Sequence, residues 1–414
     1  MLFFVFGFVT WTNSVLIPYL KIACQLNNLE SYLVAFAFYI AYLVMAVPSG
    51  WLLTKVGFKK GMSAGLFMMA LGAIIFIPAA MTRQYSLFLL GLFVQGTGLA
   101  ILQTASNPYI TILGPIESAA KRISIMGIFN KIAGALAPII LGAITLKDAD
   151  GITKRLFLMT NSQKQTLLDQ LAQRVIGPYI IIMVILVVLA GIIYLSNLPE
   201  VETPIDRKTD RLPAQQRSSQ FPHLIVGAFT LFMYVGAEVL AGDSIINYGA
   251  SQGIVLSTAK FFTACTMSGM IVGYIIGITC IPRFLKQEKA MTISAILGVI
   301  FTMMALVTKG YASVFCIALL GLANSLVWPA IWPLAIKGLG NFTKRGSSLL
   351  VMGIAGGAVI PLIYGRIADA FNLQQAYVVL IPCYLTIFYF SIWGHKLKQK
   401  ALVDEQLVAQ GELV

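Results

Sequence analysis

Residues 98–138 read GLAILQTASNPYITILGPIESAAKRISIMGIFNKIAGALAP, and residues 321–361 read GLANSLVWPAIWPLAIKGLGNFTKRGSSLLVMGIAGGAVIP. At a fixed offset of 223 residues, the two stretches share Gly-Leu-Ala, Lys-Arg, Gly-Ala and a proline. Nearer the two starts, Gly7 matches Gly236 at an offset of 229. Chance matches of small residues do not explain a shared Lys-Arg and proline in one register. The repeat predicts two similar halves in parallel orientation, with a ligand site between them near the bilayer midplane.

The composition is that of a membrane protein. Of 414 residues, 58% are hydrophobic and 11% are charged, with a mean hydropathy of +0.85, whereas soluble domains have about 25% charged residues. Apolar runs long enough to span a bilayer lie at 2–22, 32–55, 61–80, 85–114, 123–145, 177–198, 221–248, 256–282, 289–307, 311–339, 346–371 and 376–398. The sequence therefore predicts an all-α membrane protein with twelve transmembrane helices in two pseudo-symmetric six-helix bundles, and excludes most soluble enzymes.

The polar breaks predict the domain organisation. We expect an N-terminal bundle over 1–198, a linker of mixed charge over 199–220, a C-terminal bundle over 221–398 and a tail over 399–414. Between the fifth and sixth spans, NSQKQTLLDQLAQRV predicts a short amphipathic helix capped by Asn161. Its apolar stripe comprises Leu167, Leu168, Leu171 and Val175.

Charge places the termini. The chain has 29 Lys and Arg and 16 Asp and Glu, a net charge of +13. With the N-terminus in the cytosol, eighteen basic residues fall on the cytosolic side and nine on the other. The positive-inside rule then predicts a multi-pass protein of the bacterial inner membrane with both termini cytoplasmic. The first residues lack a basic region and cleavage site, so no removable signal peptide is expected.

A few ionisable residues lie within the spans, where such residues are functional candidates by default. Glu238 and Asp243 are five residues apart, about 140° around a helix, so they cannot share one cavity unless the helix unwinds near Gly242. We expect Lys131 to pair with one of these two acids, and we take all three as candidates for coupling to an ion. Arg366 and Asp369 are expected to form a helical ion pair near the membrane surface.

Neutral polar and indole side chains form a second set. Amides offer donors and acceptors to sugar hydroxyls, and an indole covers the apolar face of a pyranose. Interhelical hydrogen bonding is the alternative role for each. The candidate sugar-binding residues are Asn13, Gln103, Asn107, Asn130, Asn247, Asn324, Trp11, Trp328 and Trp332.

The sequence offers few residues for metal binding, disulfide formation or catalysis. Two histidines and five scattered cysteines suggest neither a metal site nor a disulfide framework. We find no nucleophile or cofactor motif, so a membrane enzyme is not favoured, and no cofactor is expected beyond H⁺ or Na⁺ as a coupling ion. The expected partners are a small sugar and the lipid bilayer, not nucleic acid, and we expect a monomer.

The whole chain resembles the fucose/glucose/galactose permease branch of the major facilitator superfamily, especially its bacterial glucose/galactose-type members. The resemblance rests on TNSVLIPYLK (12–21), LQTASNPYITILGP (102–115), the Phe-Asn of GIFNK (127–131), YVGAE (234–238) and KGLGNFTKRGSSLLVMGIAGG (337–357). It implies that Asn130 binds sugar. Proton-coupled members carry an Asp where this chain has Ser14 and a Glu where it has Gln103.

These observations predict a secondary transporter that imports a glucose- or galactose-like monosaccharide by alternating access, as a cation-coupled symporter. Asp243 lies opposite Ser14 at the offset of 229, so it is the candidate replacement for the missing acid of the first span. The alternatives are an amino-sugar (N-acetylglucosamine) permease, a fucose permease and an uncoupled uniporter. A non-transporting sugar sensor is also possible, but it would be expected to carry a soluble extension longer than residues 399–414.

Overall fold

The computed structural model describes residues 1–112, 119–156, 159–197, 222–281, 284–337 and 343–397. The side chains of 107–112, 119–124, 150, 153–154, 156, 343–345 and 347 also lie outside this description. The predicted linker and tail fall outside it. The described residues contain helices and turns but no strand.

The N-terminal half supplies six spans. They are span 1, formed by α1 (Leu2–Trp11) and α2 (Asn13–Ala23); spans 2 and 3, both in α3 (Asn28–Thr82); span 4, α4 (Tyr85–Ile112); span 5, α5 (Ala119–Thr145); and span 6, α8 (Ile176–Leu195). The long α3 is two helices that meet at Gly57, whose φ of 78° and ψ of 170° are not helical. Glycine adopts a positive φ without the steric penalty of other residues, so the chain reverses direction there.

The C-terminal half supplies the other six. They are span 7, α9 (Pro222–Asp243) and α10 (Ile245–Ser251); span 8, α11 (Leu256–Ala259) and α12 (Phe262–Cys280); span 9, α13 (Gln287–Val307); span 10, α14 (Gly310–Asn324) and α15 (Val327–Ile336); span 11, α16 (Thr343–Met352), η5 (Gly353–Ala355) and α17 (Gly356–Ala370); and span 12, η6 (Gln375–Val379), α18 (Leu380–Ile392) and η7 (Gly394–Lys396). Eleven described helices are long and apolar enough to cross a membrane, and α3 contributes two spans. The predicted twelve-span fold is confirmed.

The outer surface of the bundle is apolar. Large exposed hydrophobic side chains are frequent on the peripheral helices, for example Ile181 and Val188 on α8 and Ile293 and Ile300 on α13. In lipid a helix satisfies its backbone hydrogen bonds internally, and its apolar side chains need no cover. This surface therefore faces the acyl chains of the bilayer.

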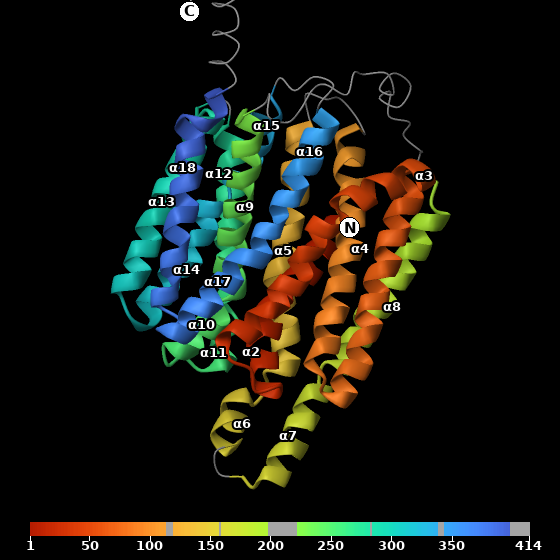
Figure 1. Cartoon of the computed structure of the whole chain (residues 1–414), viewed down its shortest axis with the longest axis vertical. Helices are drawn as coiled ribbons and strands as arrows, with labels where there is room; N and C mark the ends of the chain where they lie inside the picture. The colour runs from red at the N-terminus through yellow and green to blue at the C-terminus, as the bar shows by residue number, and fades with distance from the viewer. Residues whose placement is uncertain (113–118, 157–158, 198–221, 282–283, 338–342, 398–414) are drawn as a thin grey trace, which may run out of the picture.

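The two halves use the same helix contact. A Cβ atom on Gly7 of span 1 would lie 1.9 Å from the carbonyl oxygen of Asn130 in span 5. A Cβ atom on Gly236 of span 7 would lie 2.2 Å from the Cγ1 of Ile360 in span 11. These glycines are the pair that match in the sequence repeat. The N-terminal elements, red to yellow, and the C-terminal elements, green to blue, lie beside each other in Figure 1.

Two further helices project beyond the spans at one end of the bundle, which we call the α7 face (Figure 1). They are α6 (Ala149–Leu156), which we did not predict, and α7 (Asn161–Gln173). The amphipathic helix is confirmed, with Leu168 and Leu171 buried. Its N-cap, however, is Thr160 rather than Asn161, and the backbone N–H of Thr160 donates to Oε1 of Gln163 at 3.3 Å.

Span 7 breaks directly after Asp243: α9 continues through that residue, and the break lies at Ser244. One local prediction needs correction. Arg366 and Asp369 form no ion pair among the described residues. The carboxylate of Asp369 instead accepts hydrogen bonds from the first turn of span 2, because the exposed N–H groups of a helix start lie within its reach.

We expect Gly7→Ala to destabilise the protein. The new methyl group would overlap the Asn130 carbonyl, and overpacking of a tight contact costs about 1–3 kcal/mol. Thermal unfolding in detergent should show a lower apparent Tm. Gly191→Ala in α8 is the matched control, since nothing lies within 4 Å of its added Cβ. Equal Tm values for the two variants would contradict this account of the contact between spans 1 and 5.

Candidate functional site

An ion pair joins the two halves inside the bundle. Nζ of Lys131 in span 5 lies 2.6 Å from Oε1 of Glu238 in span 7, and the two side chains are only 8% and 11% exposed. An unpaired charge at this depth is costly, so each side chain supplies the counter-charge that the other needs. The predicted pairing across the halves is confirmed, and the partner of Lys131 is Glu238 rather than Asp243.

The indole of Trp11 packs against this pair. Lys131 Nζ lies 4.7 Å from the centroid of the Trp11 ring, within the range of a cation–π interaction. A Cβ atom on Gly134 would lie 2.4 Å from the indole, and one on Gly242 would lie 2.1 Å from it. The ring therefore fills the space between spans 5 and 7 at the break of span 1. Trp11 is buried, and its ring lies against Lys131.

Tyrosines surround the carboxylate of Glu238. Tyr234 of span 7, Tyr274 of span 8 and Tyr384 of span 12 each interact electrostatically with it. Tyr384 donates a hydrogen bond to Oδ1 of Asn324, at 3.1 Å. The predicted sugar residue Asn324 is thus fully buried and linked to Glu238 through a tyrosine.

The aromatic side of the site continues along span 10. Trp328 and Trp332 stack with ring centroids 5.7 Å apart, and Trp328 lies 6.3 Å from the ring of Tyr234. Both indoles are half-buried. The structure therefore brings these two predicted residues together beside the tyrosines that surround Glu238.

The N-terminal half contributes amides. Gln103 on α4 is half-buried and donates from Nε2 to the hydroxyl of Tyr42 on span 2, at 2.9 Å. Asn130 is half-buried and directly precedes Lys131 on α5. Asn107 lies on the same helix as Gln103, but its side chain is outside the described residues. Partial burial leaves Gln103 and Asn130 able to exchange their present contacts for sugar hydroxyls.

A second polar cluster lies around Asp243. Its carboxylate is fully buried, and neither oxygen has a hydrogen-bond partner within the described part of the chain. Tyr39 and Tyr32, both on span 2, interact electrostatically with it, and the hydroxyl of Tyr39 has no partner there either. Asn247, one turn beyond the acid, also has an unpartnered Nδ2. Asp243 therefore lies against span 2, whereas Glu238 pairs with Lys131 of span 5, and Tyr39 interacts electrostatically with both acids.

The start of α2 holds the remaining predicted residue. Asn13 is fully buried, and both polar atoms of its amide lack a partner among the described residues. The next residue, Ser14, occupies the position of the acid in the resemblance described above. Its hydroxyl donates to the carbonyl oxygen of Trp11 at 2.8 Å, so it satisfies the broken backbone of span 1 and carries no charge.

The tyrosines are the functional candidates that sequence reasoning missed. Their rings suit an apolar helix, so the sequence alone does not distinguish packing from a site role. A signal existed for Tyr234, which lies four residues before Glu238 and hence on the same helix face. No comparable signal existed for Tyr39, Tyr42, Tyr274 or Tyr384, because their partners are on other helices.

Comparison with known proteins covers nearly the whole chain. The family model described as Major Facilitator Superfamily matches residues 1–360. A glucose/galactose transporter of Brucella abortus is 35% identical over 96% of this chain and 93% of its own length. An L-fucose-proton symporter of Escherichia coli is 31% identical over 94% of this chain and 90% of its own.

A solved structure agrees with these relatives. The Major Facilitator Superfamily transporter FucP, crystallised in the outward conformation, superposes with a TM-score of 0.72 at 29% identity, over 95% of this chain and 96% of that one. The repeat, the twelve spans and the charged residues between the halves all fit such a fold. The chain belongs to the Major Facilitator Superfamily.

Proposed function

We propose that this protein imports a monosaccharide of the glucose or galactose type by alternating access, together with a proton. The observation that carries this proposal is the group of half-buried amides and indoles that flanks the Lys131–Glu238 pair between the two halves. The names of the related glucose/galactose transporters and L-fucose-proton symporters support the substrate class. The basic loops support a cytoplasmic position for the face opposite α7.

The sugar site in this proposal uses both halves. Gln103 and Asn130 bind hydroxyl groups from one side, and Trp328 and Trp332 cover the apolar face of the ring from the other. Glu238 is linked to the amide side through Lys131, which follows Asn130, and to the indole side through Tyr234, which lies beside Trp328. It can accept a hydrogen bond from a hydroxyl while it remains paired with Lys131. A sugar in this position would touch both halves, and the relative position of the halves is what changes during alternating access.

Proton coupling is assigned to Asp243. A buried carboxylate without a counter-ion is expensive, whereas the protonated acid needs only hydrogen bonds. We infer that Asp243 is protonated in this conformation and loses its proton when the halves move and water reaches it. Its position on span 7, pseudo-symmetric to Ser14 on span 1, supports a transfer of the coupling role from one half to the other.

The substrate assignment is tested by counterflow in proteoliposomes loaded with unlabelled sugar. We expect labelled glucose or galactose to exchange in preference to fucose and N-acetylglucosamine. Asn130→Ala should raise the half-saturating sugar concentration by about 5- to 150-fold, because an unpaired hydroxyl in a binding site costs about 1–3 kcal/mol. Asn161→Ala, at the exposed start of α7, should leave it unchanged. Exchange of none of these sugars would refute the substrate class, and unchanged kinetics in Asn130→Ala would remove Asn130 from the site.

The ion pair is tested by a double-mutant cycle. Lys131→Met leaves Glu238 without its counter-ion, and removal of one partner of a buried pair costs about 3–5 kcal/mol. Thermal unfolding of the purified protein should show a clear loss of stability. Adding Glu238→Gln to this variant should restore most of the loss, because no uncompensated charge remains. Additive effects of the two substitutions would show that the pair does not contribute to stability as a unit.

Coupling is tested at Asp243 in membrane vesicles. Asp243→Asn keeps the size of the side chain but cannot bind and release a proton, so it should abolish accumulation of sugar against a gradient while sugar exchange continues. Asp169→Asn is the matched control, since Asp169 is an exposed acid paired with Arg83. Undiminished accumulation by the Asp243 variant would overturn the coupling role.

A further inference from the structure

The carboxylate of Asp369 forms a contact between the two halves at the α7 face. Asp369 lies near the end of span 11, and its Oδ1 and Oδ2 accept hydrogen bonds from the backbone N–H groups of Asn28 and Leu29, at 2.9 and 2.8 Å. These two residues form the start of span 2. The interaction therefore ties the C-terminal end of one bundle to the N-terminal end of a helix in the other.

The start of span 2 needs this outside acceptor. The first N–H groups of a helix have no partner within it. Asn27 and Glu30 form a capping box, in which the Glu30 N–H donates to the Asn27 side chain and the Asn27 N–H donates to the Glu30 carboxylate. The N–H groups of the two residues between them are left over, and Asp369 accepts both. A negative charge at a helix N-terminus is also favoured by the helix dipole.

Neighbouring contacts hold the same two ends together. Lys21 at the end of span 1 donates to Oδ1 of Asn28 at 2.5 Å and interacts electrostatically with Asp369. A Cβ atom on Gly365 of span 11 would lie 2.9 Å from the ring of Tyr32 and 3.0 Å from the Cα of Leu29. The absence of a side chain at Gly365 thus lets the helices approach closely enough for Asp369 to reach its donors.

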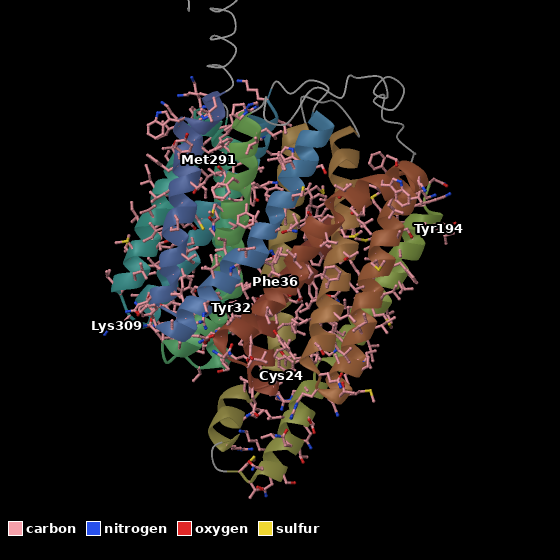
Figure 2. All side chains as sticks on the ribbon, in the orientation of Figure 1. Cys24, Tyr32, Phe36, Tyr194, Met291 and Lys309 are labelled. Carbon is pink, nitrogen blue, oxygen red and sulfur yellow. The ribbon has the colours of Figure 1, made fainter. Side chains whose placement is uncertain are left out.

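Aromatic packing closes the interface on the side of this contact that lies deeper in the bundle. The rings of Tyr32 on span 2 and Tyr364 on span 11 meet edge to face, with centroids 5.2 Å apart. Figure 2 labels Tyr32 where the N-terminal half meets the C-terminal half, toward the α7 face. Water reaching the middle of the bundle from this face between spans 2 and 11 would have to separate these rings.

The sequence repeat shows that this carboxylate is special to one interface. Gly365 matches Gly142 of span 5 at the offset of 223, and a Cβ atom on Gly142 would lie 3.2 Å from Cβ of Lys260 at the start of span 8. Both pseudo-symmetric helix pairs therefore close the α7 face at a glycine. The residue that matches Asp369 is Leu146, whose side chain offers no acceptor. Of these two helix pairs, only spans 2 and 11 are joined by a carboxylate contact among the described residues.

We propose that Asp369 is a gating residue: its carboxylate keeps the α7 face closed by capping the first turn of span 2, and the cap is released when that face opens. This inference rests on the proposed alternating access. The donors and acceptor lie at an exposed end of the bundle, so water can replace each hydrogen bond on opening. The contact thus biases the two conformations without locking either.

Distance measurements between spin labels test the gate. We place the labels at Gln84→Cys and Lys309→Cys, two exposed positions at the α7 face in opposite halves, with the five native cysteines replaced. Pulsed electron spin resonance on the full chain in lipid nanodiscs gives the populations of short and long distances. Asp369→Ala should raise the ratio of open to closed populations by about 3- to 10-fold. Asp369→Asn, which keeps one oxygen acceptor, should give a smaller rise.

Glu30→Ala is the matched control. Glu30 caps the same helix start, but from within the same half, so its loss should leave the ratio unchanged. An unchanged ratio in Asp369→Ala, or an equal rise in Glu30→Ala, would overturn the gating role. The readout needs no sugar. A population shift in a protein that exchanges none of the tested sugars would therefore support the gate while refuting the proposed function.

Discussion

The central constraint on this protein is that a charge inside the bilayer needs a partner. Lys131 cannot reach bulk water from the middle of span 5, and its partner Glu238 belongs to the other half. Their ion pair therefore links two bundles that must also move relative to each other. In a bilayer, moving an apolar surface from the lipid chains to another apolar surface gains little free energy. Polar contacts of this kind therefore contribute strongly to how the halves pack together.

The polar residues between the halves divide into two layers of different chemistry. Around Glu238 the charges are matched and Tyr384 is hydrogen-bonded to Asn324, although the buried Tyr234 hydroxyl has no partner among the described residues. Around Asp243 both carboxylate oxygens and the hydroxyl of Tyr39 are buried without partners among the described residues. The first arrangement suits a ligand that exchanges one hydrogen bond for another. The second suits a group whose charge changes during the cycle, because protonation removes the reason for it to have a counter-ion.

The sequence predicted the fold almost completely and the site only in outline. The twelve spans follow from the hydropathy of the sequence, and the two halves follow from its internal repeat. Partner choice within the membrane was harder: Lys131 had two possible acids, and only the rotation of α9 decides for Glu238. An indole suits a sugar, so the sequence predicts Trp11 as a ligand contact, and the structure places its ring against Lys131. Its burial between Gly134 and Gly242 depends on two helices that no local pattern relates to it.

Asp369 shows why the end of a helix is difficult to read from sequence. Three residues from Arg366, it has the spacing of a helical ion pair, and an exposed pair of that kind contributes little. Two backbone donors at the start of another helix compete better, since they are fixed in place and their side of the helix is positive. Every helix start in the sequence provides such backbone donors, but the sequence does not show which helix start lies next to Asp369. If the halves rock about the central ion pair, the largest displacements fall at the ends of the spans. A weak, solvent-exposed contact at such an end therefore controls the conformational balance more readily than a stronger contact at the pivot.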